Sequence, residues 1–255
     1  MRLSALPALE DNYIWVLEDT AGALVVDPGE AAPVIAHFDA HGSAPDVVLL
    51  THHHPDHCGG VATLQQHYPS LVVHAPDDPR ITLDCHRVRD GDVLELLRQP
   101  ANVIGVPGHT RSHVAYLVAG HLFCGDALFS LGCGRMFEGT PEQMHASLRR
   151  LAALDDDTLV CCGHEYTLAN AAFALAVEPG NDALHRRHAD AIAQRRAAHP
   201  TLPARLADER ACNPFLRCHV PAVRDAVAAR NDAAGPLDDV GTFAALRAWK
   251  DGFTA

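Results

Sequence analysis

One short stretch of this sequence restricts its possible folds more than any other, because it places four histidines and an aspartate directly after an apolar segment. Asp46–Leu50 has the composition of a β-strand and leads into Thr51–His57, which reads THHHPDH. In an extended chain, residues two positions apart point to the same side. His52 and His54 can therefore converge on one point, while the histidine between them points away.

The same stretch continues onto a turn that offers two further ligands. Asp56 and His57 can aim at a second point close to the first. Imidazole and carboxylate groups are the ligands expected for zinc and similar first-row metals. A solvated, histidine-rich loop is the simpler interpretation, and a nucleophile formed by Cys58 and a histidine is a rival mechanism. We favour a metal site because candidate ligands recur in three later segments.

Those segments are Pro107–Thr110, Cys124–Ala127 and Cys162–Glu165. Each places a histidine or an aspartate just after an apolar strand and next to a glycine. Strand ends that meet at one rim of a sheet are where a site is assembled, and glycine lets the backbone approach such a site closely. The candidate ligands in these segments are His109, Asp126 and His164.

The first half of the chain alternates short β-rich runs with helical stretches. One helix is well marked, because Thr140 is a good N-cap and Pro141 suits the first helical position. Strands followed by helices predict an α/β sandwich rather than an all-β fold. The expected strands are Tyr13–Glu18 and Ala23–Asp27 (a hairpin), Asp46–Leu50, Leu71–Ala75, Val93–Leu97, Val103–Val106, Val114–Val118, Leu122–Cys124 and Thr158–Cys162, and the expected helices are Ala32–His41, Gly59–His67 and Pro141–Leu154.

The character of the sequence changes near Tyr166. Strand-like runs stop, and alanine-rich helical stretches follow, separated by prolines and glycines. We therefore predict a first domain over residues 1–165, which carries the candidate ligands, and a smaller, mostly α-helical domain over residues 166–255. The expected helices of this second domain are Leu168–Val177, Asp182–Ala198, Pro221–Arg230 and Asp239–Lys250.

Composition bears on partners and location. The formal net charge of −12 disfavours binding to nucleic acid or to an anionic membrane. No apolar run approaches the roughly 20 residues that span a bilayer, and the N-terminal segment lacks the apolar core of a signal peptide. We expect a cytoplasmic monomer that acts on a small molecule. The eight cysteines include no C-x-x-C pair, so we expect reduced thiols that mostly serve packing.

Taken together, the ligand segments resemble the metallo-β-lactamase superfamily. THHHPDH is similar to its T-H-x-H-x-D-H signature, and the later candidate ligands match its remaining motifs in order. The resemblance implies an α/β fold, an αββα sandwich of the metallo-β-lactamase type, that holds two divalent metal ions. Zinc is the expected metal, with iron or manganese as alternatives. The resemblance assigns His52, His54 and His109 to the first metal, Asp56, His57 and His164 to the second, and Asp126 to a bridge between them.

Such a pair of metals implies hydrolysis. Two cations about 3.5–4 Å apart can hold a bridging water and lower its pKa from about 15.7 to about 7. Asp126 and Asp56 would then be catalytic residues, because they hold the metals that carry this hydroxide nucleophile. The metals also polarise a carbonyl and stabilise the oxyanion. A thiolate leaving group, whose parent thiol has a pKa of about 8.5, needs little help from a general acid.

Further segments are similar to glyoxalase II, the hydroxyacylglutathione hydrolases. They span nearly the whole chain, including a helical domain that many members of the superfamily lack. The resemblance implies hydrolysis of S-D-lactoylglutathione and related glutathione thioesters to glutathione and D-lactate, the second step of methylglyoxal degradation. The segments are Asp11–Tyr13, LFSLGCGRMFEGT at 128–140, CGHEYTLAN at 162–170, NPFLR at 213–217 and LRAWKDGF at 246–253.

The resemblance also implies contacts to glutathione. Arg135 stands where the family has Lys or Arg, and Phe137 where it has Tyr or Phe. Tyr166 follows the last ligand motif. Arg247 and Lys250 lie one helical turn apart, on one face of a predicted helix. An acidic protein needs such a cationic patch to hold substrate carboxylates, although a solvated helix face is the simpler interpretation of Arg247 and Lys250.

A few positions depart from the family pattern. Ser112 and Ala127 stand where the family usually has Gly and Thr, and Phe137 lacks the hydroxyl that some members use on the substrate. None of these positions is a candidate metal ligand, so the departures bear on substrate affinity. We expect His113 to support the site or the fold rather than to bind metal.

Two other functions remain open at this level. A persulfide dioxygenase of the same fold would use a single iron and would not need Asp56, His57 and His164 or the helical domain. A noncatalytic, metal-stabilised binding module would not need a bridge that generates hydroxide. Metal count and thioester turnover together separate these possibilities.

Overall fold

A computed structural model describes residues 1–230 and 237–254, which form two compact units built from interleaved segments. These two units do not coincide with the expected domains, residues 1–165 and 166–255. Residues 106–111 and 126–160 belong to the second unit, because helix α4 (Pro141–Ala152) packs against helix α9 (Asp239–Asp251). The first unit comprises Met1–Gly105, Ser112–Gly125 and Cys161–Glu165, and the second comprises Val106–Arg111, Asp126–Val160 and Tyr166–Ala255.

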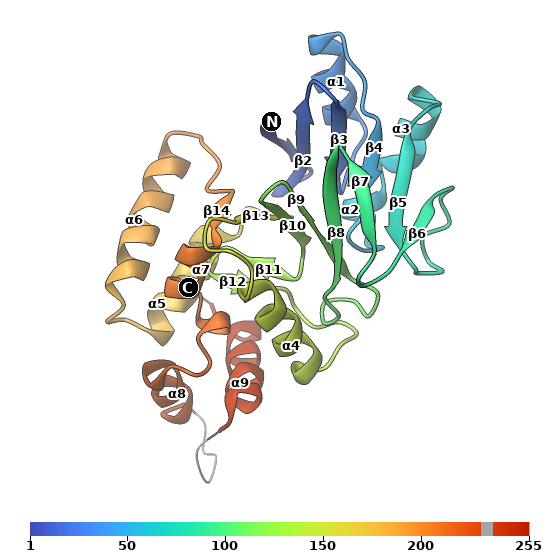
Figure 1. Ribbon diagram of the computed structural model, residues 1–255. Coiled ribbons are helices and arrows are strands. Elements are labelled where there is room, and N and C mark those ends of the chain that lie inside the picture. Colours follow the sequence, from blue (N-terminus) through green and yellow to red (C-terminus); the bar gives the residue numbers. More distant parts are fainter. Residues whose placement is uncertain (231–236, 255) are drawn as a thin grey trace. The chain divides into compact units, whose positions relative to one another are not determined.

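The first unit contains a six-stranded mixed sheet in the order β1-β2-β3-β4-β5-β6 (Figure 1). Strands β1 to β3 pair antiparallel, and β3 to β6 pair parallel. Parallel neighbours need a crossover connection, which α1 (Ala32–His41) provides between β3 and β4 and α3 (Val61–His67) provides between β4 and β5. The strands are β1 Arg2–Ala8, β2 Asn12–Asp19, β3 Gly22–Val26, β4 Val47–Leu49, β5 Val72–Pro76 and β6 His86–Val88.

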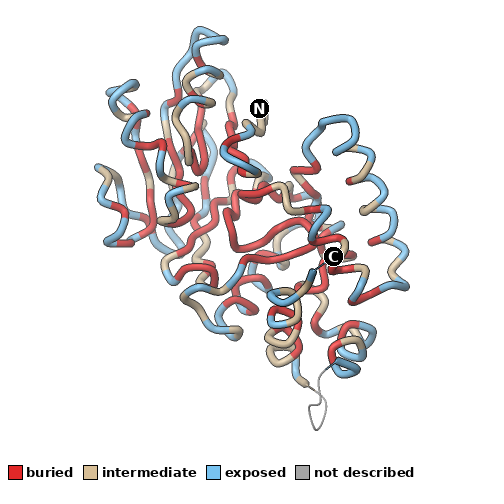
Figure 2. The backbone as a smooth tube through the Cα atoms, turned by 180° about the vertical axis from the view of Figure 1, so that it is seen from behind, coloured by how far each residue is buried: buried red, intermediate tan, exposed pale blue. Residues whose placement is uncertain are grey.

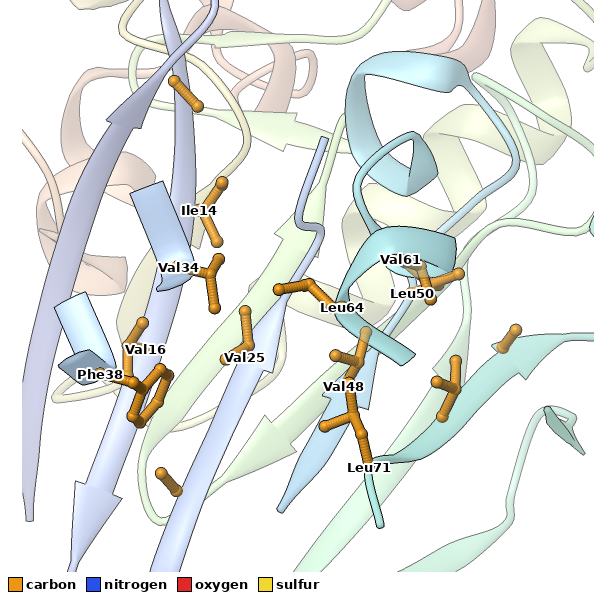
Figure 3. Packing of buried hydrophobic residues seen from close by; sticks show 14 of the residues in the cluster. Ile14, Val16, Val25, Val34, Phe38, Val48, Leu50, Val61, Leu64 and Leu71 are labelled. Carbon is orange, nitrogen blue, oxygen red and sulfur yellow. The ribbon is translucent and has the colours of Figure 1, made fainter. Parts of the chain in front are cut away.

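An apolar cluster joins this sheet to α1 and α3 (Figure 3). Val34 and Phe38 are four residues apart in α1, so they lie on one face of the helix. They belong to the same buried cluster as Val16 of β2, Val25 of β3 and Leu64 of α3. β-branched residues suit the pleated strand surface. The cluster anchors the strands whose ends carry the candidate ligands.

The first unit also contains an antiparallel meander of four strands, β7 to β10. The β9–β10 hairpin turns through Ala119 and Gly120, whose φ angles of 48° and 77° belong to the left-handed region that two-residue hairpin loops favour. Cys161 and Cys162, at the end of β13 (Leu159–Cys162), lie beside β10. The meander strands are β7 Val93–Leu96, β8 Gln99–Gly105, β9 Val114–Val118 and β10 His121–Gly125.

The second unit is mostly helical. Helix α4 begins with a capping box, in which Thr140 Oγ1 accepts from Gln143 N at 3.3 Å and Gln143 Oε1 accepts from Thr140 N at 3.0 Å. Short strands occur as well: β11 pairs with β12, and β14 pairs with the first residues of β13. The remaining elements are β11 Leu128–Phe129, β12 Gly132–Cys133, α5 Thr167–Val177, α6 Asp182–Arg196, β14 Ala204–Arg205, α7 Leu206–Cys212, the 3₁₀ turn η1 Pro214–Leu216, α8 Pro221–Ala228 and α9.

The observed elements confirm most of the expected ones and correct others. Asn12–Asp19 and Gly22–Val26 form the expected hairpin. The expectation that strands stop near residue 166 was wrong, because Ala204–Arg205 adds a strand beside β13. The expected helix Gly59–His67 is α3, which begins at Val61, and a separate short helix, α2 (Pro55–Cys58), lies where a turn was expected. The elements that sequence patterns did not predict are β1, β6, β11, β12, β14, α2, α7 and η1.

Burial follows the layers of each unit. Figure 2 shows that buried backbone concentrates in strands, whereas turns and the outer faces of helices are exposed. All eight cysteines are free thiols, and six of them are buried. Burial raises the pKa of the Cys212 and Cys218 thiols to about 12, so both remain protonated and serve packing. Within residues 1–230 and 237–254, no helix is long and apolar enough to cross a membrane.

We predict that Phe38→Ala lowers the free energy of unfolding by about 3–5 kcal/mol, because Phe38 is 1% exposed and its loss leaves a cavity between α1 and the sheet. Urea denaturation followed by circular dichroism measures the change. Val93→Ala is the matched control, because Val93 is 63% exposed and should change stability by less than about 0.5 kcal/mol. Equal effects of the two substitutions would contradict this packing.

Candidate metal centre

The first histidine pair lies just beyond the end of β4. His52 is buried, and its Nε2 lies 3.0 Å from His54 Nδ1, so the two rings aim ligand atoms at the same point. The i, i+2 spacing therefore has the predicted effect. His53, which lies between them in the sequence, points away from the pair as predicted, because its Nδ1 lies 3.6 Å from Asp78 Oδ2.

Asp27 orients two of the candidate ligands at once. It follows β3 and is buried, with a φ of 52°. Asp27 Oδ2 lies 3.0 Å from His57 Nδ1 and accepts a hydrogen bond from Thr51 Oγ1 at 2.7 Å. The Thr51 hydroxyl lies 3.0 Å from His52 Nδ1. If His52 and His57 both carry their proton on Nδ1, His57 donates to Asp27 and His52 donates to the Thr51 hydroxyl, which in turn donates to Asp27. Nε2 of both histidines is then available as a metal ligand.

Asp56, His57 and His164 form a second ligand group within the first unit. Asp56 Oδ2 lies 3.3 Å from His57 Nε2 and 3.4 Å from His164 Nε2, and the three ligand atoms lie within 4.8 Å of one another. Zinc–nitrogen and zinc–oxygen bonds of 2.0–2.2 Å in a tetrahedron place neighbouring ligand atoms about 3.3 Å apart. The donor set and its spacing therefore fit a divalent metal ion.

The segment before β2 completes this group. Asp11 Oδ1 lies 2.8 Å from His164 Nδ1, so His164 is also held through Nδ1. Asn12 Nδ2 donates to Asp56 Oδ2 at 3.2 Å and to the Asp56 carbonyl at 3.3 Å. Burial raises the pKa of Asp56, but the neighbouring side chains of His164, His57 and Asn12 outweigh it and hold the pKa far below its usual range. Asp56 is thus an anion that can ligate a cation.

Backbone contacts fix where the helix that carries Asp56 begins. A Cβ added to Gly29 would lie 2.0 Å from the Asp56 carbonyl oxygen, so only glycine allows this approach. His164 is placed in a similar way by β2, because Tyr13 N donates to the Gly163 carbonyl at 2.8 Å and Trp15 Nε1 donates to the Cys162 carbonyl at 2.9 Å.

His109 and Asp126 lie together in the second unit. His109 Nε2 is 3.5 Å from Asp126 Oδ2, and His109 Nδ1 lies 2.8 Å from the Arg135 carbonyl. Both ligand candidates are buried. A Cβ on Gly134 would lie 1.9 Å from the Asp126 carbonyl oxygen, so glycine is required between Asp126 and Arg135. His109 is thus a third histidine whose Nδ1 has an acceptor and whose Nε2 faces a carboxylate.

The β11–β12 hairpin connects Asp126 to Arg135, and buried polar side chains hold it. Glu209, which is fully buried in α7, accepts from Leu131 N at 2.7 Å and from Ser130 Oγ at 2.8 Å. Asn213 Nδ2 donates to the carbonyls of Phe129 and Gly132 at 3.1 and 2.9 Å. Burial raises the pKa of Glu209 despite these hydrogen bonds. The helical part of the second unit thereby fixes the loop that follows Asp126.

The candidate substrate residues all lie in the second unit, but their surroundings differ. The Arg135 side chain is about half exposed, and its Nε donates to Asp251 Oδ1 at 3.2 Å. Phe137 is exposed, with its ring centroid 5.2 Å from that of His109. Tyr166 is partly buried against Phe129, with ring centroids 5.2 Å apart.

Arg247 and Lys250 are not equivalent. Arg247 is 6% exposed, and it donates from Nη1 to the Cys133 carbonyl and from Nη2 to Asp251 Oδ1, both at 2.9 Å. The solvated-face interpretation of Arg247 was therefore wrong, because tertiary packing buries this side of α9. Lys250 is half-buried, and its Nζ donates to the Ala169 carbonyl at 3.1 Å.

Sequence reasoning missed several residues that the site uses. Asp27 lies after an apolar strand and before Pro28 and Gly29, the same setting that singled out the other ligands, so this signal was present. Asp11 and Asn12 were noted only as part of a family resemblance. His113, expected to support the site, stacks on His52 with ring centroids 4.7 Å apart.

Two family models match the chain. One described as the metallo-beta-lactamase superfamily matches residues 9–164, and one described as the hydroxyacylglutathione hydrolase C-terminus matches residues 165–253. A hydroxyacylglutathione hydrolase from Xanthomonas axonopodis pv. citri is 60% identical over 257 residues, which cover all of both chains.

Solved structures resemble the fold. The crystal structure of ETHE1 from Myxococcus xanthus has a TM-score of 0.66 and 23% identity, and the match covers 98% of this chain and 100% of that one. The crystal structure of TTHA1623 in a di-iron-bound form has a TM-score of 0.55 and 29% identity, covering 64% of this chain and 92% of that one. These matches confirm the expected α/β fold of the metallo-β-lactamase type.

We predict that Asp27→Asn weakens metal binding by about 10- to 100-fold, because His57 loses its carboxylate acceptor and Thr51 loses the group that orients it toward His52. Competition with a chromophoric chelator measures the affinity. Asp39→Asn, on the exposed side of α1, is the matched control and should bind metal normally. Unchanged affinity in Asp27→Asn would show that this carboxylate does not support the ligands.

Proposed function

Because this chain belongs to the hydroxyacylglutathione hydrolase family of the metallo-β-lactamase superfamily, we propose that it hydrolyses S-D-lactoylglutathione and related glutathione thioesters to glutathione and a 2-hydroxy acid such as D-lactate. It is a thioester hydrolase. Metal-dependent hydrolysis, whatever the substrate, is supported mainly by the group of Asp56, His57 and His164. The ligand atoms of these residues are spaced as around a metal ion.

We assign two divalent metal ions to the chain, with zinc as the expected metal. The donor groups are of the right chemistry, and TTHA1623, which shares the fold, is described in a di-iron-bound form. When bound, the two cations would supply a hydroxide nucleophile and an electrophile for the thioester carbonyl. The assignment is His52, His54 and His109 for one metal, Asp56, His57 and His164 for the other, and Asp126 as the bridging, catalytic carboxylate.

The residues around the ligands have separate tasks. Asp27, Asp11 and the Arg135 carbonyl orient imidazoles through Nδ1, which leaves Nε2 for coordination. Asn12 holds the Asp56 carboxylate from two directions. No side chain needs to protonate the leaving group, because a thiol with a pKa of about 8.5 leaves readily as its thiolate.

The contacts of Cys58 disfavour the rival nucleophile. Its Sγ donates to the His53 carbonyl at 3.3 Å, so the thiol is engaged with the backbone rather than with an imidazole. A thiol nucleophile needs an adjacent base that removes its proton. We therefore keep hydroxide as the nucleophile and give Cys58 a packing role.

For substrate binding, we assign direct contact with glutathione carboxylates to Arg135 and Lys250. Arg247 contributes through Asp251, because Asp251 Oδ1 accepts hydrogen bonds from both Arg247 and Arg135. Phe137 and Tyr166 supply aromatic surface. Burial and the neighbouring Arg247 lower the pKa of Lys250. A substrate carboxylate beside it would raise this pKa again and favour the protonated, positively charged form.

The alternative of a persulfide dioxygenase with one iron is not favoured. The full-length relatives carry the name hydroxyacylglutathione hydrolase, and a family model specific to the C-terminal part of those enzymes matches here. The cytoplasmic location, the monomeric state and the lack of nucleic-acid and membrane partners stay predictions.

We predict that the purified, zinc-loaded protein hydrolyses S-D-lactoylglutathione and that removing the metal with a chelator lowers kcat at least about a hundredfold. Loss of several kcal/mol of transition-state stabilisation corresponds to this factor at about 1.4 kcal/mol per tenfold step. Absorbance of the thioester follows the reaction, and added zinc should restore it. Full activity without metal, or no turnover of any glutathione thioester by the loaded protein, would contradict the proposal.

We predict that replacing Arg135 and Lys250 together with Ala lowers kcat/KM for S-D-lactoylglutathione by roughly tenfold or more, because each hydrogen bond to a charged group contributes about 1.5–3 kcal/mol. Metal content should not change. Arg186→Ala, an exposed arginine on α6, is the matched control. A small thioester without carboxylates should be hydrolysed equally by all variants. If the double substitution slows its hydrolysis as much as that of the glutathione thioester, Arg135 and Lys250 do not bind the glutathione carboxylates.

A further inference from the structure

The second unit contains a pocket of about 550 Å³ that none of the proposed metal ligands or glutathione contacts lines. Its walls come from α4, from the segment that runs from α7 through η1 to His219, and from the start of α9. This volume is within the range of sites that hold small organic molecules, about 300–1,000 Å³. The pocket belongs entirely to one unit, so its walls are described by the packing of that unit alone.

His145 of α4 lines the pocket and is the most unusual residue in it. It is 8% exposed, and it has no hydrogen bond or ion pair with any residue of the described parts of the chain. Its nearest ring neighbour is the apolar Phe243, at 5.8 Å between centroids. Burial lowers the pKa of His145, so the imidazole is neutral near pH 7 and offers both a donor and an acceptor. Neither ring nitrogen is among the buried polar atoms that lack a partner, so the nitrogens reach the open space of the pocket, where a ligand can contact them.

Two arginines and one aspartate line the pocket, so the lining itself carries one positive charge in excess, while the Asp238 carboxylate outside the lining also acts on His145. Asp239 is neutralised by Arg224, with Nη2 and Oδ1 2.5 Å apart, and Arg210 is neutralised by Asp156, with Nη1 and Oδ1 2.9 Å apart. Arg149 is exposed and pairs with no carboxylate among residues 1–230 and 237–254. The guanidinium of Arg149 is thus available to an anion at the rim of the pocket. It favours a ligand with a single negative charge.

The remaining surface of the pocket is apolar. Leu148 and Phe215 are buried, and Ala152 and Leu216 are partly buried beside them. A fully hydrated ion would gain nothing from these side chains, whereas a ligand with an apolar body would bury its surface against them. We propose that this pocket is a second ligand site, which binds a small organic monoanion with its carboxylate toward Arg149 and His145 and its apolar body against Leu148 and Phe215.

Isothermal titration of the full-length, zinc-loaded protein with 3-phenylpropionate tests the proposal. With 11 non-hydrogen atoms, this probe should bind with a Kd of about 1 mM or lower. The neutral analogue 3-phenyl-1-propanol should bind at least about tenfold more weakly, because it cannot pair with Arg149. No saturable binding of the carboxylate, or equal affinity for the alcohol, would overturn the proposal.

Two variants locate the probe. Arg149→Glu should weaken 3-phenylpropionate binding by about tenfold or more, because it reverses the charge at the rim. Ala152→Trp should abolish binding, because it fills the pocket from α4. Arg150→Glu is the matched control, since it makes the same charge change at the next position, which does not line the pocket. Thermal denaturation shows that each variant is folded, and Arg149→Glu suffices if Ala152→Trp does not fold.

The carboxylate of the probe could also bind to the metal ions, and the same titrations distinguish binding at the metals from binding in the pocket. Binding at the metals would survive both pocket variants, would disappear after treatment with a chelator, and would inhibit thioester hydrolysis competitively. That result would overturn the pocket proposal and leave the proposed hydrolase function intact. Binding that persists in the chelated protein and is lost in Arg149→Glu, but not in Arg150→Glu, is the result we expect.

Discussion

A histidine that binds a metal through Nε2 is held in place by a hydrogen bond at its other ring nitrogen, Nδ1, and much of this structure serves to provide such bonds. His57, His164 and His109 have an oxygen acceptor within 3.0 Å of Nδ1, supplied by Asp27, Asp11 and a backbone carbonyl respectively. An imidazole with two free nitrogens can rotate or change tautomer, whereas a fixed Nδ1–H presents Nε2 in one direction. The acceptors come from strand ends and turns far from the ligands in sequence.

The requirement explains why polar groups are buried so close to the apolar cores. Asp27 and Glu209 are both buried carboxylates, which would be costly without partners. Asp27 accepts hydrogen bonds from Thr51 through both of its carboxylate oxygens. Glu209 holds the hairpin that separates Asp126 from Arg135. In both cases a buried acid fixes a backbone segment next to a ligand, so removing either acid should disturb ligand geometry as well as stability.

The candidate ligands could be singled out from the sequence, because residue type and position coincide. A histidine or aspartate that follows an apolar strand and adjoins a glycine has few structural reasons to be there. Asp27 has the same setting, but its partner His57 lies 30 residues away, and no local pattern links the two. Glu209 could not be predicted for another reason: in α7 it stands among charged residues and reads as exposed, and only tertiary packing makes it fully buried.

The substrate side was less predictable than the metal side. Arg247 and Lys250 do lie on the predicted helix, yet one is buried against Cys133 and the other reaches the Ala169 carbonyl. Helical spacing gives the face of a residue but not the depth at which that face is packed. The units were also not predictable from a change in composition, because residues 106–111 and 126–160 precede that change and nevertheless belong to the second unit.

The most direct measurement of the central claim is anomalous diffraction from crystals of the metal-loaded protein, collected on both sides of the zinc absorption edge. The account predicts two anomalous peaks per chain, one bound by His52, His54 and His109 and one bound by Asp56, His57 and His164, with Asp126 in contact with both. The bound histidines should keep their Nδ1 contacts to Asp27, Asp11 and the Arg135 carbonyl. A single peak, or two peaks remote from Asp126, would contradict the account.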